Sequence, residues 1–334
     1  MTARRDFLKR SLAAGSLLTT GGLTGGLAGW APAPPRRPAA DVTDDELIAV
    51  LKQPVLRREL FPDPVVIASM DLLKNGEEFV VRVRSDDGAE GYAVSNGGRL
   101  KTVWPFFVMQ VAPYFVGKDA HDLEALIDGV YDHDSNYKYQ GMGLWVPVAS
   151  AEFAVLDLLG QIAGRPASTL VGDVVRPVID VYHATNHRGY TPEESAAELK
   201  ALVEAERPKA IKFKVGGRMN HPEVPAGRTE RAIPLIRPAV GDDIILYADA
   251  NGSYDVEEGI RIGRMLEDIG VAIYEEPVPF DWLWETKEVA DALAMPVAGG
   301  EQESSMRRFR WMVAHDGLDI LQPDLFYFGG LIRT

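Results

Sequence analysis

Between residues 178 and 324 the chain alternates short apolar runs with longer stretches in which apolar residues recur at helical spacing. Runs separated by about 25 to 30 residues are typical of parallel strands that alternate with helices in a barrel. We expect strands at residues 178–182, 210–215, 244–249, 271–275, 296–301 and 318–324. The pattern therefore predicts an α/β fold with an incomplete (β/α) barrel of about six of the usual eight strands.

A different pattern precedes the barrel, at residues 41–172. Runs at 65–69, 78–84 and 90–95 predict a short antiparallel meander with a turn at 85–88, and apolar spacing at 149–162 predicts a helix that ends near Gly164. The expected organisation is a signal and Pro-rich linker (1–40), an N-terminal α+β capping domain (41–172) and a partial barrel that forms the catalytic domain (173–334).

Three acidic residues end successive predicted strands at equal intervals of 26 residues, namely Asp249, Glu275 and Glu301. The carboxyl ends of parallel barrel strands converge on one face, so equal spacing brings the three carboxylates together. Carboxylate oxygens are the ligands that Mg²⁺ prefers, with Mn²⁺ as an alternative. The spacing therefore predicts a metal site, although a single acidic residue at a strand end is more often a helix cap or a solvated charge.

Two lysines share one face of the preceding strand. In residues 211–215 the apolar side chains alternate with Lys212 and Lys214, which places both cations on the face opposite the apolar residues. In a barrel strand the two lysines would point into the mouth, where a lysine beside a second cation can act as a general base. On an edge strand the same pattern would be a solvated face.

Several short motifs resemble those of the enolase superfamily, most closely its mandelate racemase and acid-sugar dehydratase branch. They are KFK (212–214), ADAN (248–251), EEP (275–277), GGEQ (299–302), LQPDL (321–325) and GG (329–330), and their order and spacing match as well. The resemblance covers most of the chain, from residue 64 onward. It implies an N-terminal cap over a barrel and a lysine base used together with Mg²⁺, the known pattern of this superfamily.

The resemblance also implies roles for individual residues. Asp249, Glu275 and Glu301 would be the metal ligands, Lys214 the candidate base with Lys212 beside it, and Asn251 a substrate contact. Asp324 matches an aspartate that, in this branch, orients a histidine on the next strand. The sequence ends ten residues after Asp324, so we expect a C-terminally truncated barrel without that histidine.

A long segment separates Lys214 from Asp249 and predicts a loop over the catalytic face at residues 216–228. Loops at this face of a barrel carry specificity. Arg218 or Arg228 could therefore bind a distal carboxylate or hydroxyl groups of the substrate. Solvated surface arginines are the alternative.

The N-terminus resembles a twin-arginine export signal, because Arg4 and Arg5 are followed by Asp-Phe-Leu-Lys and a Gly-rich apolar stretch. That stretch is too interrupted for a stable membrane span, so we expect export through the twin-arginine machinery to the periplasm or beyond. The absence of cysteine excludes disulfides and thiolate catalysis, and the net charge of −14 argues against nucleic acid as a partner.

These features lead to three functional hypotheses. The first is Mg²⁺-dependent removal of the proton α to a carboxylate, with dehydration of a sugar acid through an enediolate. The second is a racemase or epimerase of a hydroxy acid, which shares the first step. The third is an inactive truncated remnant. The partner is a small carboxylate substrate, and a homo-oligomer stays open because the family often forms symmetric assemblies.

Overall fold

The computed structural model describes residues 43–334, and the export signal and linker expected at residues 1–40 lie outside the described residues. The chain divides into two compact units. The barrel unit consists of residues 43–53, Asp180–Gly299 and Arg310–Leu321, and the cap unit consists of Pro54–Ile179, Gly300–Phe309 and Gln322–Thr334. Each unit is described separately below.

The barrel unit contains six parallel strands that pair in chain order. The strands are β4 (His183–Ala184), β5 (Ala210–Lys214), β6 (Ile245–Asp249), β7 (Val271–Glu275), β8 (Val297–Gly299) and β9 (Ile320–Leu321). Helices connect them, namely α8 (Pro192–Glu206), α9 (Arg228–Val240), α10 (Val256–Asp268), α11 (Leu283–Ala292) and α12 (Met306–Ala314), which has residues in both units. A further helix, α2 (Asp44–Leu51), precedes them. Within residues 43–334 the sheet is open, with β4 and β9 at its edges.

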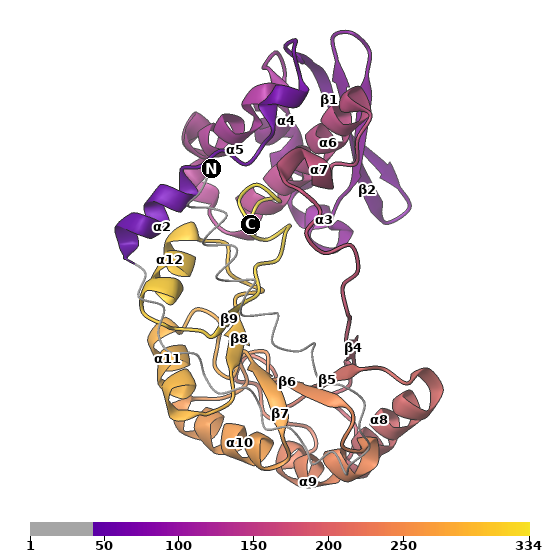
Figure 1. Ribbon diagram of the computed structural model, residues 1–334, viewed down its shortest axis with the longest axis vertical. Helices are drawn as coiled ribbons and strands as arrows, with labels where there is room; N and C mark the ends of the chain where they lie inside the picture. The colour runs from indigo at the N-terminus through magenta and orange to yellow at the C-terminus, as the bar shows by residue number, and fades with distance from the viewer. Residues whose placement is uncertain (1–42) are drawn as a thin grey trace. The chain divides into compact units, whose positions relative to one another are not determined.

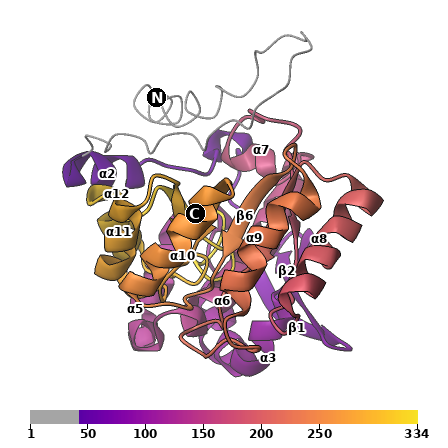
Figure 2. The same ribbon diagram turned by 90° about the horizontal axis from the view of Figure 1, so that it is seen from below.

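Helices α8 to α11 follow one another in an arc outside the strands (Figure 1). Figure 2 shows α8, α9 and α10 as successive helices of the same layer. Apolar side chains from both layers form the core of the barrel unit, because strands buried between helices are apolar on the helix side. The fully buried members include Ile211, Leu246, Tyr274 and Val297 from the strands.

The first barrel strand differs from the expectation. We expected it at residues 178–182, but the strand that pairs with β5 is β4, through His183↔Ile211 and Ala184↔Lys212. Val178, Ile179 and Val181 are exposed. Apolar alternation shows that a segment is extended, but pairing depends on the neighbouring strand, so the prediction was wrong by several residues. The other five strands lie within their expected ranges.

Local signals fix the segment that follows β4. Thr191 begins α8 with a capping box, in which Glu194 N–H donates to the Thr191 hydroxyl and Thr191 N–H donates to the Glu194 carboxylate. Pro192 at the first helical position suits the helix start because its missing N–H would have no partner there. The short loop between β4 and α8 is therefore held at both ends.

The cap unit combines a three-stranded meander with helices. Its strands are β1 (Ile67–Asn75), β2 (Glu78–Ser85) and β3 (Glu90–Val94), and its helices are α3 (Gly97–Phe106), α4 (Ala112–Phe115), α5 (Leu123–Asp132), α6 (Met142–Ala163) and α7 (Ser168–Val171). The remaining helical segments are η2 (Arg58–Leu60), η4 (Ala120–Asp122) and η5 (His133–Tyr139), which are 3₁₀ helices, and η3 (Phe107–Val111), which is a π-helix. The meander and its turn at 85–88 confirm the predicted pattern, although β1 begins later and is longer than expected.

Helix α6 is the central helix of the cap unit. It is long and apolar enough to cross a membrane by length and composition, yet 78% of its apolar window is buried inside the protein, as in the core helix of a globular domain. It begins before the predicted residue 149 and ends at Gly164, whose left-handed conformation (φ 60°) is the usual way to stop a helix. One acidic residue, Glu152, is buried within it.

Candidate active site

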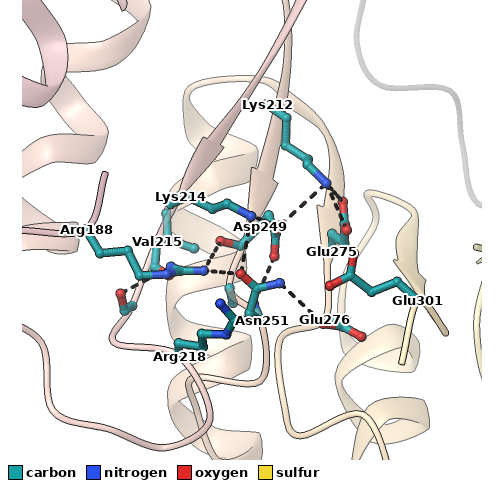
Figure 3. Close-up of polar contacts among 12 residues, drawn as sticks. Arg188, Lys212, Lys214, Val215, Arg218, Asp249, Asn251, Glu275, Glu276 and Glu301 are labelled. Atoms are coloured by element: carbon teal, nitrogen blue, oxygen red, sulfur yellow. Dashed lines mark hydrogen bonds and ion pairs between the residues drawn. The ribbon is translucent and has the colours of Figure 1, made fainter. Parts of the chain in front are cut away.

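The carboxyl ends of β5, β6 and β7 bring four charged residues together. The strand register pairs Lys214 with Asp249 and Asp249 with Glu275. Both carboxylates are buried, with Asp249 0% and Glu275 2% exposed. The predicted equal spacing thus places these two acidic residues side by side on neighbouring strands (Figure 3).

Both lysines of β5 face these carboxylates, as the alternation predicted. Lys212 Nζ lies 2.9 and 2.8 Å from the two carboxylate oxygens of Glu275 and 3.5 Å from Asp249 Oδ2. Lys214 Nζ donates to Asp249 Oδ2, and to Asn251 Oδ1 at 3.2 Å. The apolar residues that alternate with the lysines, Ile211 and Phe213, are buried on the other face.

The pKa of Lys212 reflects two opposing effects. Burial disfavours its ammonium charge and lowers the pKa, but the charge and hydrogen bonds of Glu275, together with the charge of Asp249, outweigh burial and raise the pKa above its ordinary value. The carboxylates of Glu275 and Asp249 therefore favour the charged form of Lys212.

Asn251 follows Asp249 and is held in a left-handed conformation (φ 44°). Its N–H donates to Asp249 Oδ1 at 2.9 Å, and its side-chain oxygen accepts from Lys214 and from the guanidinium of Arg188. With its oxygen turned toward these two cations, the amide nitrogen faces Glu276 Oε2 at 3.5 Å. The predicted substrate contact thus lies directly beside the candidate base.

Arg188 was not identified from the sequence, although it lies in this site. It comes from the loop after β4 and donates to the backbone oxygens of Val215 and Gly216, to Asp249 O at 3.5 Å and to the Asn251 side chain (Figure 3). Burial lowers the pKa of its guanidinium. Only its place shortly after the first barrel strand could have drawn attention to it.

The two arginines of the long loop have different surroundings. Arg228 is 3% exposed and donates to the backbone oxygens of Tyr190, Lys214 and His187 and to Ser195 Oγ. These bonds hold the start of α9 to the neighbouring segments. The alternative of a solvated surface arginine is therefore wrong for Arg228, and its contact with the substrate stays a prediction. Arg218 is exposed and follows β5 on the same side as Asn251.

Two predicted site residues belong to the cap unit. Glu301 follows the end of β8 by two residues, and its carboxylate accepts from the Gln302 side chain at 3.0 Å. Asp324 Oδ1 accepts from the N–H groups of Phe326 and Tyr327, at 2.8 and 2.9 Å. Asp324 therefore organises the turn that follows it, and its expected role in orienting a histidine stays a prediction.

The donor set is suited to a hard divalent cation. Asp249 and Glu275 supply buried carboxylate oxygens from adjacent strands, the type of ligand that Mg²⁺ prefers. Their negative charge is balanced here by the two lysines. Within residues 43–334, no group of three or more histidine, cysteine or acidic side chains is arranged to hold a metal ion, so the third ligand stays a sequence prediction.

Comparisons with known proteins place these features in a family. Residues 194–334 match the family described as Enolase C-terminal domain-like. Arabinonate dehydratase of Saccharolobus solfataricus is 28% identical over 260 residues, which cover 76% of this chain and 67% of that protein. L-talarate/galactarate dehydratase of Salmonella typhimurium is 25% identical, over 75% of this chain and 62% of that protein. The chain thus spans about two thirds of the length of these curated relatives.

Solved structures agree with this match. A candidate racemase from Roseobacter denitrificans has a TM-score of 0.74 and 33% identity, over 80% of this chain and 73% of that chain. A mandelate racemase/muconate lactonizing protein from Paracoccus denitrificans, complexed with magnesium, has a TM-score of 0.70 and 26% identity, over 80% and 73% of the two chains. The fold is therefore of the (β/α)-barrel type with an N-terminal capping domain, and the chain belongs to the enolase superfamily.

Proposed function

We propose that this protein removes the proton α to the carboxylate of a sugar acid and that the β-hydroxyl is then lost as water. The observation that carries the proposal is the ion-paired group of Lys212, Lys214, Asp249 and Glu275 at the ends of three adjacent parallel strands. Curated relatives named as sugar-acid dehydratases support the same reaction class.

The proposed roles of the residues differ with their depth in the site. Lys214 is the last residue of β5 and is the group placed to take the α-proton, since substrate binds at the carboxyl ends of barrel strands. Lys212 lies one pleat deeper, where its ammonium holds Glu275 and adds positive potential beneath the substrate. Asn251 accepts a hydrogen bond from Lys214 Nζ at 3.2 Å and so orients the nitrogen that takes the α-proton.

A metal ion fits this proposal through Asp249 and Glu275, with Glu301 as the third ligand predicted from its equal spacing. Bound Mg²⁺ would supply positive charge for the substrate carboxylate and for the enediolate that forms when the α-proton leaves. In the structure the two carboxylates are paired with the ammonium groups of Lys212 and Lys214.

The test is hydrogen exchange on a panel of sugar acids in deuterated water, with Mg²⁺ present and then removed by a chelator. Wild-type protein is expected to incorporate deuterium at the α-carbon, and Lys214→Ala to lose at least about 100-fold of that rate, the usual contribution of a general base. Lys209→Ala removes an exposed lysine of the same unit and should leave the rate unchanged.

Product analysis in the same samples separates dehydration from racemisation or epimerisation, because a dehydratase forms a keto acid and a racemase returns the starting acid in both configurations. Exchange by Lys214→Ala at the wild-type rate, on acids of both α-configurations, would show that this lysine is not the base. No exchange by the wild-type protein on any acid would favour an inactive remnant.

A further inference from the structure

Three consecutive residues in the loop after β5 adopt a left-handed backbone conformation. Arg218, Met219 and Asn220 have φ values of 73°, 47° and 56°. Residues with a Cβ avoid this region at a cost of about 1–2 kcal/mol each, so a run of three without glycine requires strong support from its surroundings. Such strained segments cluster at ligand sites, which makes this segment a candidate for function.

The support comes from the loop that follows β6. Arg218 N–H donates to Ser253 Oγ at 2.7 Å, Met219 N–H to Asn251 O at 2.9 Å and Asn220 N–H to Gly252 O at 2.9 Å. All three contacts fix the strained segment to the stretch that begins with Asn251, the residue that contacts Lys214. The position of Arg218 is therefore tied to the candidate base through one short loop.

The guanidinium of Arg218 differs from those of the other two arginines near the site. The guanidinium groups of Arg188 and Arg228 donate hydrogen bonds to backbone oxygens and to polar side chains of the protein. Arg218 is exposed, and within residues 43–334 only its backbone N–H and C=O make hydrogen bonds. A rigid backbone thus displays a guanidinium whose donors are available to a ligand.

A second positive charge lies close to it. Arg188, from the loop after β4, donates to the side-chain oxygen of Asn251. Figure 3 shows both guanidinium groups beside Asn251. Two like charges close together repel each other, and an anion that binds between or beside them offsets this repulsion.

We propose that Arg218 binds a second carboxylate of the substrate and so selects dicarboxylic sugar acids over those with a single carboxylate. The inference rests on the proposed function, because the first carboxylate is the one at the reacting end near Lys214. A planar guanidinium with free donors matches a carboxylate in two parallel hydrogen bonds, which gives Arg218 more selectivity than a lysine would have.

The matched probes are galactarate and galactonate, which differ only in whether the distal carbon is a carboxylate or a hydroxymethyl group. Wild-type protein is expected to bind and turn over galactarate at least 10-fold better than galactonate, the effect expected of one charge-assisted pair. Arg218→Gln should remove this preference by lowering kcat/KM for galactarate at least about 10-fold. Arg218→Lys should keep only part of it.

The control is Arg231→Gln, which removes an equal charge from a nearby exposed arginine that bonds to the backbone of residues 226 and 227. It should leave the preference intact. Arg218→Asn, a residue that tolerates the left-handed conformation, separates loss of the guanidinium from distortion of the loop. Thermal unfolding of every variant shows whether the fold is retained.

The outcomes separate the two proposals. Turnover of galactonate and galactarate with equal constants, or a preference that Arg218→Gln retains, overturns the role of Arg218 and leaves the reaction class standing. A stronger preference for 6-phosphogluconate than for galactarate overturns the assignment of a carboxylate as the distal group. Galactarate binding by calorimetry that depends on Arg218, with no turnover of either acid, supports the subsite and contradicts the proposed reaction. No binding of galactarate overturns the subsite.

Discussion

Two buried acidic sites, one in each unit, are balanced in different ways. In the barrel unit, Glu275 is paired with the ammonium of Lys212 at 2.8 Å. In the cap unit, Glu152 of α6 is fully buried and accepts the N–H of Ile332 at 3.0 Å and the N–H of Leu331. Arg333 lies near Glu152 but is stacked 3.5 Å over the ring of Trp145.

The difference shows that a full opposite charge offsets the effect of burial on a charged group, whereas backbone N–H groups offset it only in part. Burial raises the pKa of Glu152 to about 8, and the N–H groups of the C-terminal segment and the charge of Arg333 oppose this only in part. In the barrel unit the carboxylates outweigh burial and raise the pKa of Lys212. One site is therefore built around an ion pair that favours the charged forms of its groups, and the other around a carboxyl group whose charge changes near pH 8.

The largest expected effect comes from breaking the ion pair between Lys212 and Glu275. Lys212→Met leaves Glu275 and Asp249 buried with one cation fewer, and breaking a buried pair in this way typically destabilises a protein by about 3–5 kcal/mol. The free energy of unfolding, measured by chemical denaturation, should fall by this amount. The double variant Lys212→Met/Glu275→Leu should recover much of the loss, because neither group then lacks its partner.

Lys209→Met provides the matched control in the same barrel unit. Its ion pair with Asp180 has side chains that are 74% and 76% exposed, so its loss should change stability by less than about 0.5 kcal/mol. Equal effects of the two lysine substitutions would show that the Lys212 pair is not energetically distinct from a surface pair.

The sequence predicted much of the ion-paired site but little of the Glu152 site. Strand alternation placed Lys212 and Lys214 on one face of a strand, and equal spacing placed Asp249 and Glu275 at the ends of neighbouring strands, since both depend on regular strands. Glu152 stands in an apolar helix where nothing in the local pattern shows what it contacts. Its partners lie about 180 residues later in the chain, and contacts of that separation are set by tertiary packing.

The same limit explains the other omissions. Arg188 joins the site because the loop after β4 folds over the ends of β5 and β6, which no local periodicity indicates. Arg228 was expected in a loop, but it is the first residue of α9 and its guanidinium is buried against three backbone oxygens. The residue type was informative in both cases, and only the packing decides which arginine faces the substrate.

The next expected effect tests how closely the C-terminal segment packs on Glu152. Gly330 has a φ of 115°, and a Cβ on this residue would lie 1.7 Å from Glu152 Oε2. Gly330→Ala should therefore destabilise the protein by about 2–4 kcal/mol, from overpacking and from the unfavourable backbone conformation together. Unfolding by denaturant measures this loss, and Glu152→Ala in the same chain should relieve part of it.

Gly88→Ala isolates the backbone contribution. Gly88 also has a positive φ, 92°, but a Cβ there would meet nothing within 4 Å. Its substitution should cost only about 1 kcal/mol. If both glycine variants lose the same stability, the carboxyl group of Glu152 does not pack against Gly330 as the structure has it.

Apart from the control variants, the smallest expected effect concerns pH, and it distinguishes the two acidic sites most directly. The pKa of Glu152 in the folded protein, about 8, lies above its ordinary value of 4.5, so the folded state holds this proton more tightly than the unfolded state does. The stabilisation is fully present below pH 4.5 and is lost as the pH rises through 8. Between pH 6 and 8 the loss should be roughly 2 kcal/mol.

Glu152→Gln should remove this loss, because the amide has the same shape, still accepts the N–H of Ile332 and does not titrate. The measurement is the free energy of unfolding of both proteins at pH 6, 7 and 8, taken as a difference so that other titrating groups cancel.

The control is Asp157→Asn, on the same helix. Asp157 accepts the exposed N–H of Tyr92, and this variant should keep the wild-type slope of unfolding free energy against pH. The charged groups that face Glu152 are Arg333 and, beyond it, Asp128, so Asp128→Asn should alter the slope only slightly. Parallel curves for wild type and Glu152→Gln would mean that backbone N–H groups stabilise a buried carboxylate as well as the lysine does in the barrel unit, and the contrast between the two sites would disappear.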